Sequence, residues 1–247
     1  MFSFSGFQKN PAILEKSPLG AIKRLLFGKH SKISYSQCGE DIIIAGVLAA
    51  LGIKRPTYID IGAFNPVYLS NTYFFYQKGS NGVCIEPNRV LCKNIQRKRP
   101  KDICINMGIG LSAAAEAPFY IMNEATLSTF SKEEAERMCS YGNLSIEKVI
   151  TIPLITLVEV IEKYLKGCPN FISLDVEGLD LEILKSFDFA KYRPEIFCVE
   201  TITYTEDKSE KKIVPTIEFM QSNGYFVYAD TYINTIFVDR AAWAARP

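Results

Sequence analysis

The chain has 247 residues, 48% of them hydrophobic, which is enough to bury the core of one large domain. Its 28 Lys and Arg residues nearly balance its 27 Asp and Glu residues, so no net charge favours nucleic acid or an anionic membrane. The 7 cysteines form no CxxC pair, which argues against structural zinc and against a disulfide framework. With no signal-peptide pattern and no apolar stretch of spanning length, we expect a cytoplasmic protein that binds no nucleic acid.

Residues 1–34 differ in composition from the rest and predict an N-terminal arm, followed by one domain over residues 35–247. The segment LGAIKRLLFG of the arm could form a short basic amphipathic helix that touches a membrane or a partner. Its apolar face is short, so packing of the arm on its own domain is the favoured interpretation. The sole histidine, His30, lies in this arm, which argues against histidine-based catalysis.

The first regular element is a helix predicted between Ser36 and Gly52. Ser36 is a typical N-cap residue, acids follow it, and Ile43, Val47 and Leu51 repeat at helical spacing. Glycine is a common residue just after a helix, so the pattern predicts both ends.

Short apolar segments rich in β-branched or aromatic residues then alternate with helix-like segments. Such segments are typical of strands that are buried on both faces. The predicted strands are TYIDI, NGVCIE, DICINM, NFISLDV and EIFCVE. The clearest helical stripes are LVEVIEKYL and LEILKSF. This alternation predicts an α/β fold with a doubly wound, Rossmann-like sheet.

Two regions depart from the alternation. Residues 113–141 predict an insertion over the active face, with a hairpin at APFYIM and a helix beginning near Ser131. Near the end of the chain, Tyr225–Asp230 and residues 233–240 read as two strands joined by too few residues for a helix. They must pair as a hairpin, so the last strand is reversed. A reversed last strand is typical of methyltransferase sheets and favours S-adenosylmethionine over NAD.

The turn after the first strand predicts a site for a small molecule. In open α/β sheets, ligands bind beyond the carboxyl ends of the strands. Gly62 would let the backbone approach such a ligand, but Phe64 and Pro66 replace the glycines that a pyrophosphate requires. Asp60 would suit a cationic amino or sulfonium group; alternatively, it only caps the next helix. Glu86, at the end of the second strand, could accept both hydroxyls of a ribose.

A second acidic group follows the fourth predicted strand. Asp175 stands at its carboxyl end, with Glu177 in the turn, and Glu200 ends the adjacent strand. We expect these side chains to share one crevice. They could be a general base with its support, a Mg²⁺ site made of oxygen ligands, or helix-capping charges.

Together, YSQCGEDIIIAGVL, YIDIGAFNPVYLSNTYFF, GVCIEPN, ISLDVEGLDLEILKSF and EIFCVET resemble the FkbM family of S-adenosylmethionine-dependent methyltransferases. The resemblance spans about residues 35–240 and implies a class I methyltransferase fold. It further implies methyl transfer to a hydroxyl of a small molecule or glycan, such as a sugar, a glycolipid or another secondary metabolite. One departure is that many members have Asn-x-Gly late in the first turn, where this chain has Phe64, Asn65 and Pro66.

The resemblance also implies site residues. All of the expected cofactor contacts except Asn106 lie in the motifs quoted above, and Asn106 lies in the predicted strand DICINM. They are Gln37, Asp60, Gly62, Ala63, Asn65, Ser70, Asn71, Thr72, Glu86, Pro87 and Asn106. The expected catalytic residues are Asp175, Glu177 and Glu200, and the same three are the candidate Mg²⁺ ligands. Asp175 is the expected acceptor of the hydroxyl proton.

Two other functions stay open at this point. An NAD-dependent oxidoreductase could use the same strand-end acids for ribose, although the glycine-poor turn and the reversed strand argue against it. A non-catalytic ligand-binding module would have the same sheet, since the sequence does not reveal whether a pocket for the acceptor is open.

Overall fold

A computed structural model describes residues 32–112, 116–203, 205 and 209–247. The basic amphipathic segment and His30 of the expected arm lie outside these residues. Residues 34–247 form one compact unit. None of the described helices is long and apolar enough to cross a membrane.

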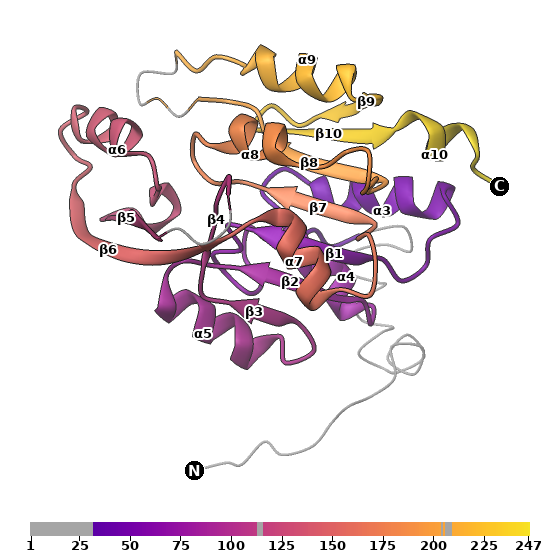
Figure 1. Cartoon of the computed structure of the whole chain (residues 1–247), viewed down its shortest axis with the longest axis horizontal. Coiled ribbons are helices and arrows are strands. Elements are labelled where there is room, and N and C mark those ends of the chain that lie inside the picture. The colour runs from indigo at the N-terminus through magenta and orange to yellow at the C-terminus, as the bar shows by residue number, and fades with distance from the viewer. Residues whose placement is uncertain (1–31, 113–115, 204, 206–208) are drawn as a thin grey trace, which may run out of the picture. The chain divides into compact units, whose positions relative to one another are not determined.

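The core of the unit is a seven-stranded sheet (Figure 1). In spatial order its strands are β3 (Ile103–Ile105), β2 (Asn81–Ile85), β1 (Thr57–Ile61), β7 (Phe171–Leu174), β8 (Ile196–Glu200), β10 (Asn234–Asp239) and β9 (Tyr225–Asp230). The first five are parallel, whereas β10 runs antiparallel to both of its neighbours. The predicted strands and the reversed last strand are therefore confirmed. The strand order reverses between β1 and β7, where ligands bind in such sheets.

Helices cover both faces of the sheet, which confirms the doubly wound α/β class. On one face the apolar core includes side chains from α7 (Leu157–Tyr164), α8 (Asp180–Ser186) and α9 (Val214–Ser222). On the other face the core includes side chains from α3 (Glu40–Ala50), α4 (Tyr73–Gln77), α5 (Arg89–Lys98) and α10 (Arg240–Ala244). Central strands are therefore buried on both sides, which explains their continuous apolar sequences.

The first helix begins later than the sequence predicts. Its N-cap is Gly39, with a left-handed φ of 93°, and not Ser36. The Ser36 hydroxyl still contributes, because it accepts a hydrogen bond from the Asp41 N–H at 3.2 Å. The intervening residues form an irregular segment, and Gln37 in this segment reaches the pocket described below.

An insertion between β3 and α7 forms a second, three-stranded sheet in the order β4–β6–β5 (Figure 1). Its elements are β4 (Gly108–Ile109), β5 (Glu116–Met122), the 3₁₀ helix η1 (Ala125–Leu127), α6 (Lys132–Cys139) and β6 (Ile146–Ile155). The helix near Ser131 is confirmed, since Ser131 is the N-cap of α6. The partner of APFYIM is β6, which the sequence did not identify because most side chains of that strand are exposed or half-buried.

A buried arginine connects β1 to α4 and α5. Arg99 is fully buried, and its guanidinium donates to the carboxylate of Asp102 at 2.7 Å and to the Thr72 hydroxyl at 2.8 Å. It also donates to Ser70 Oγ and to the Tyr58 hydroxyl, each at 3.2 Å. Arg99 follows α5, Tyr58 lies on β1 and Thr72 is the N-cap of α4, so one side chain fixes three elements.

We predict that Arg99→Met lowers the free energy of unfolding by about 3–5 kcal/mol, because it leaves the buried Asp102 carboxylate without its cation. Chemical denaturation followed by circular dichroism measures this loss. The matched control is Arg97→Met in the last turn of α5, where the exposed side chain donates to Asn94 Oδ1 at 3.2 Å. The control should change stability by less than about 0.5 kcal/mol. Equal losses in the two variants would contradict the prediction.

Candidate active site

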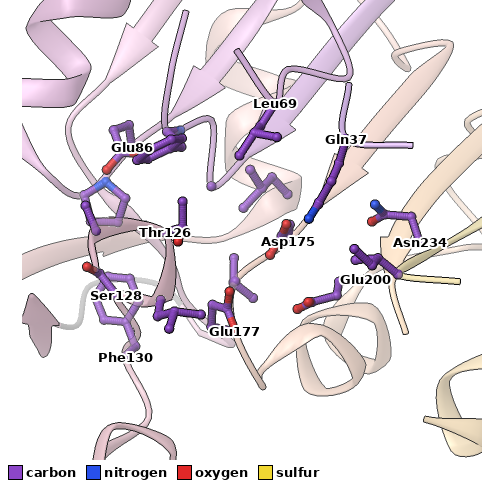
Figure 2. Close-up of a pocket in the computed structure, with 18 of the residues that line it drawn as sticks. Gln37, Leu69, Glu86, Thr126, Ser128, Phe130, Asp175, Glu177, Glu200 and Asn234 are labelled. Atoms are coloured by element: carbon purple, nitrogen blue, oxygen red, sulfur yellow. The ribbon is translucent and has the colours of Figure 1, made fainter. Parts of the chain in front are cut away.

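A pocket of about 400 Å³ lies at the carboxyl ends of the central strands (Figure 2). Its walls come from the turns after β1, β2, β7 and β8, from the segment before α3 and from the insertion. Asn71 and Asn234 add amide side chains, and Phe119 and Phe130 add aromatic rings from the insertion. The insertion thus closes one side of the crevice that the parallel strands leave open.

Glu86 is held in one orientation by the turns on either side of it. One carboxylate oxygen accepts the Phe64 N–H at 2.9 Å, and the other accepts the Asn88 N–H at 2.7 Å. The residue is only 4% exposed, yet it lines the pocket. Burial raises the pKa of Glu86 to about 7, although both backbone hydrogen bonds act to lower it. Each oxygen accepts one N–H, which leaves further acceptor capacity toward the pocket.

Gly62 is required by a close approach between two turns. Its φ is 78°, and the Asp175 N–H donates to the neighbouring Ile61 carbonyl at 3.2 Å. A Cβ atom at Gly62 would overlap the Asp175 carbonyl oxygen. Only glycine combines this conformation with this contact. Gly62 therefore allows the turns after β1 and β7 to pack closely together at the same pocket.

Three carboxylates gather on another side of the pocket. One oxygen each of Asp175, Glu177 and Glu200 lies within 4.8 Å of the others. Figure 2 shows the three converging on the cavity, with Glu86 apart from them. Glu177 has a left-handed φ of 55°, which a residue with a side chain rarely adopts. Such backbone strain persists only where surrounding contacts hold it, and it often occurs at functional sites.

The carboxylates raise one another's pKa. Burial and the charge of Asp60 raise the pKa of Asp175 to about 6. Burial and the charge of Asp175 raise the pKa values of Glu177 and Glu200 well above their ordinary value. Burial and Asp175 also raise the pKa of Asp180, whose carboxylate accepts the Val176 N–H, to about 8. The cluster therefore favours binding a proton or a cation.

The comparisons with known proteins assign the family. A model of the methyltransferase FkbM domain matches residues 60–227, which is more than half of the chain. This chain belongs to the FkbM methyltransferase family. The expected resemblance is confirmed, and the class is that of S-adenosylmethionine-dependent methyltransferases, which rules against the NAD-dependent alternative. Comparison with curated proteins finds no significant match.

Several solved structures are similar to the FkbM domain at low identity. A TehB-like methyltransferase from Corynebacterium glutamicum has a TM-score of 0.42 and 9% identity, over 93% of this chain and 100% of the other. An O-methyltransferase from Bacillus cereus has a TM-score of 0.41 and 9% identity, over 93% and 91% of the two chains. Magnesium protoporphyrin IX methyltransferase from Synechocystis has a TM-score of 0.37 and 13% identity, over 92% and 94%.

The structure brings eight of the expected site residues to the pocket. They are Gln37, Gly62, Asn71, Glu86, Pro87, Asp175, Glu177 and Glu200. All three expected catalytic acids are among them. Asn71 is fixed there by a hydrogen bond from its amide to Ser173 Oγ at 3.0 Å.

The other expected cofactor contacts do not line the pocket. Asp60 lies on the opposite side of β1, where it accepts from the Thr72 hydroxyl and lies 3.9 Å from the Arg99 guanidinium. Burial raises the pKa of Asp60, and the Arg99 charge offsets part of this effect. Asp60 thus pairs with Arg99 inside the protein, and its expected contact with a cationic ligand stays a prediction.

The remaining five also have structural roles. Ser70 and Thr72 bond to Arg99, and Ala63 packs in a buried apolar cluster. The Asn65 side chain accepts the Val67 and Tyr68 N–H groups at 3.0 and 2.9 Å and so shapes the turn after β1. Asn106 donates to the backbone carbonyls of Glu86 and Pro87 at 2.9 and 2.6 Å, which supports the pocket from behind.

Sequence reasoning missed several pocket residues. Asn88 was missed although asparagine just before a helix is a typical N-cap residue. In the structure it is the N-cap of α5, and its side chain accepts the Val90 N–H at 2.9 Å. Glu40 was missed as a support: it is fully buried and its carboxylate accepts from the Asn234 amide at 3.2 Å. Nothing in the local sequence indicates that Asn234 lines the pocket, because it enters from the final hairpin.

The acidic cluster fits a hard divalent cation in its chemistry. Its three carboxylates supply oxygen ligands, which Mg²⁺ prefers over nitrogen or sulfur. A cation would also neutralise the charges that raise the pKa values described above. The donor set therefore allows Mg²⁺ without requiring it.

We predict that Glu200→Gln stabilises the protein at pH 8. A carboxyl group with a raised pKa in the folded state favours folding when it is protonated, and this contribution is lost as pH rises through the folded pKa. Removing one charge from the cluster should therefore add about 1–2 kcal/mol at pH 8 and much less at pH 4. Thermal denaturation at both pH values measures the difference.

The matched control for this prediction is Glu182→Gln on the exposed face of α8, where the carboxylate pairs with Lys185 at 2.8 Å. It should have no stabilising effect at either pH. A Glu200→Gln variant that loses stability at pH 8 would show that Glu200 is held by contacts stronger than the repulsion.

Proposed function

We propose that the chain transfers a methyl group from S-adenosylmethionine to a hydroxyl of a sugar, a glycolipid or another secondary metabolite. The observation that carries the proposal is that one pocket holds both the fixed Glu86 carboxylate and the cluster of three acids. Glu86 suits a ribose, and the cluster suits a reaction that releases a proton. Family membership supports the same class of reaction.

The pocket residues near Glu86 would hold the cofactor. Each Glu86 oxygen already accepts one backbone N–H, so its remaining lone pairs can accept one ribose hydroxyl each. Ile85, Pro87 and Leu91 supply apolar surface beside it, which suits a purine ring. Binding of hydroxyl donors would favour the ionised carboxylate and lower the pKa of Glu86 from its raised value. When bound, S-adenosylmethionine supplies an electrophilic methyl group on sulfur.

Asp175 is the proposed general base. As the acceptor oxygen bonds to the methyl carbon and the sulfur–carbon bond of the cofactor breaks, the Asp175 carboxylate would take the hydroxyl proton. A carboxylate whose pKa is raised to about 6 is a stronger base than a solvent-exposed one and is still mostly ionised at neutral pH. Glu177 and Glu200 support this role, because their charges keep a proton favourable on the cluster.

The same cluster could act through Mg²⁺. A cation held by Asp175, Glu177 and Glu200 would bind the acceptor hydroxyl and lower its pKa, so that less basicity is needed from the protein. The two modes differ in one measurable property, since only the second depends on a removable ion. A non-catalytic binding module would show no methyl transfer, with or without Mg²⁺.

We predict that S-adenosylhomocysteine raises the melting temperature and that NAD does not. Ligand at about a hundred times its dissociation constant stabilises the folded state by about 2.7 kcal/mol. Glu86→Ala should weaken this binding by about 1–3 kcal/mol, because two hydroxyls lose a charged acceptor. The control is Glu147→Ala on the exposed part of β6, which should bind like the wild type. A shift with NAD alone would refute the proposed cofactor.

We predict that Asp175→Asn lowers turnover by about 10²- to 10⁴-fold while cofactor affinity is kept, because the amide is nearly isosteric but cannot take the proton. Mass spectrometry of methylated products from a panel of sugars first identifies an acceptor, and S-adenosylhomocysteine formation then measures turnover. If Mg²⁺ is involved, a chelator abolishes wild-type activity and added Mg²⁺ restores it. A variant that melts earlier but turns over normally would refute the catalytic role.

A further inference from the structure

Thr129 belongs to the insertion and contacts the turn that carries Glu177. The residue is fully buried, and its hydroxyl donates to the backbone carbonyl of Glu177 at 2.9 Å. The same hydroxyl accepts the Ser131 N–H at 3.0 Å. A hydroxyl has one proton to donate, so acceptance from Ser131 directs that proton toward Glu177.

The position of this hydroxyl is fixed by two parts of the insertion, β5 and the N-terminus of α6. The Tyr120 N–H donates to the Thr129 carbonyl at 2.8 Å, and the Thr129 N–H donates to the Tyr120 carbonyl at 3.1 Å. These bonds tie Thr129 to β5. Ser131 is the N-cap of α6, and its side chain accepts the Glu134 N–H at 3.2 Å. The flanking residues Ser128 and Phe130 line the pocket, whereas Thr129 bonds to the turn.

The turn that receives this hydrogen bond is strained. Glu177 has φ 55° and Gly178 has φ 98°, so two successive residues are left-handed. Glycine adopts this conformation freely, but Glu177 requires contacts that hold it there. Loss of the Thr129 donor would leave the carbonyl without this partner and would let the turn relax. The Glu177 carboxylate would then move with the turn.

We propose that Thr129 is a positioning residue for methyl transfer: its hydroxyl holds the turn at Glu177 in the left-handed conformation that keeps the carboxylate beside Asp175 and Glu200. The catalytic meaning of this inference rests on the proposed function, but the geometry can be tested without turnover. The insertion thereby does more than cover the pocket, because it sets the arrangement of the acids.

The experiment is solution NMR of the full chain, with the Glu177 backbone signals assigned and its φ angle measured from backbone couplings. In Thr129→Val, which keeps the side-chain shape but removes the donor, we expect Glu177 to leave the left-handed conformation and to show the couplings of a residue with negative φ. Thr129→Ser keeps the hydroxyl and should keep the positive φ of the wild type. Thr151→Val makes the same chemical change on an exposed part of β6 and should also match the wild type.

Folding of each variant is checked by circular dichroism, and Thr129→Ala replaces Thr129→Val if the latter does not fold. A folded variant without the hydroxyl in which Glu177 keeps its positive φ would overturn the inference. So would an equal change of φ in Thr151→Val. Failure of the wild type to bind S-adenosylhomocysteine would instead overturn the proposed function, and the conformation of Glu177 could still be measured.

Discussion

The structure depends on one buried cation. Arg99 is fully buried, and it contacts Asp102, Thr72, Ser70, Tyr58 and Asp60. A buried guanidinium is tolerated only where carboxylates and hydroxyls replace the water that it loses. Its partners come from β1, from the N-terminus of α4 and from the residues just before β3. The first turn of the sheet, which carries Gly62 and supports Glu86, is therefore placed by an ion pair on the other side of β1. Three residues that the sequence predicts as cofactor contacts, Asp60, Ser70 and Thr72, belong to this network.

The pocket places charge where it costs stability. Three carboxylates lie close together, each with a raised pKa, and Glu177 adopts a strained left-handed conformation. A chain selected only for stability would avoid both features, whereas a site that binds a proton or a cation requires the first. The hydrogen bond from Thr129 and the close packing of Gly62 against Asp175 keep this arrangement from relaxing.

The seven-stranded sheet and the insertion contribute different side chains to the pocket. The sheet supplies the acids from the ends of parallel strands, which meet at one edge as in other open α/β folds. The insertion supplies the aromatic and hydroxyl side chains that face these acids, and it forms a small sheet of its own. Variation in such an insertion can change the lining of the pocket while the main sheet is kept, because loops tolerate change better than the sheet that carries them.

The sequence by itself determined the α/β class, the strands of the main sheet and its reversed last strand, because hydrophobic period and connection length are local properties. It also placed Glu86, Asp175 and Glu200 in one pocket, since each ends a parallel strand and such ends share an edge. Only the tertiary structure decided that Asp60 pairs with Arg99, that β6 is the partner of β5 and that Thr129 holds Glu177. These contacts join residues far apart in the chain. The partner that a strand side chain contacts depends on how distant segments pack together, and no local pattern in the sequence encodes this packing.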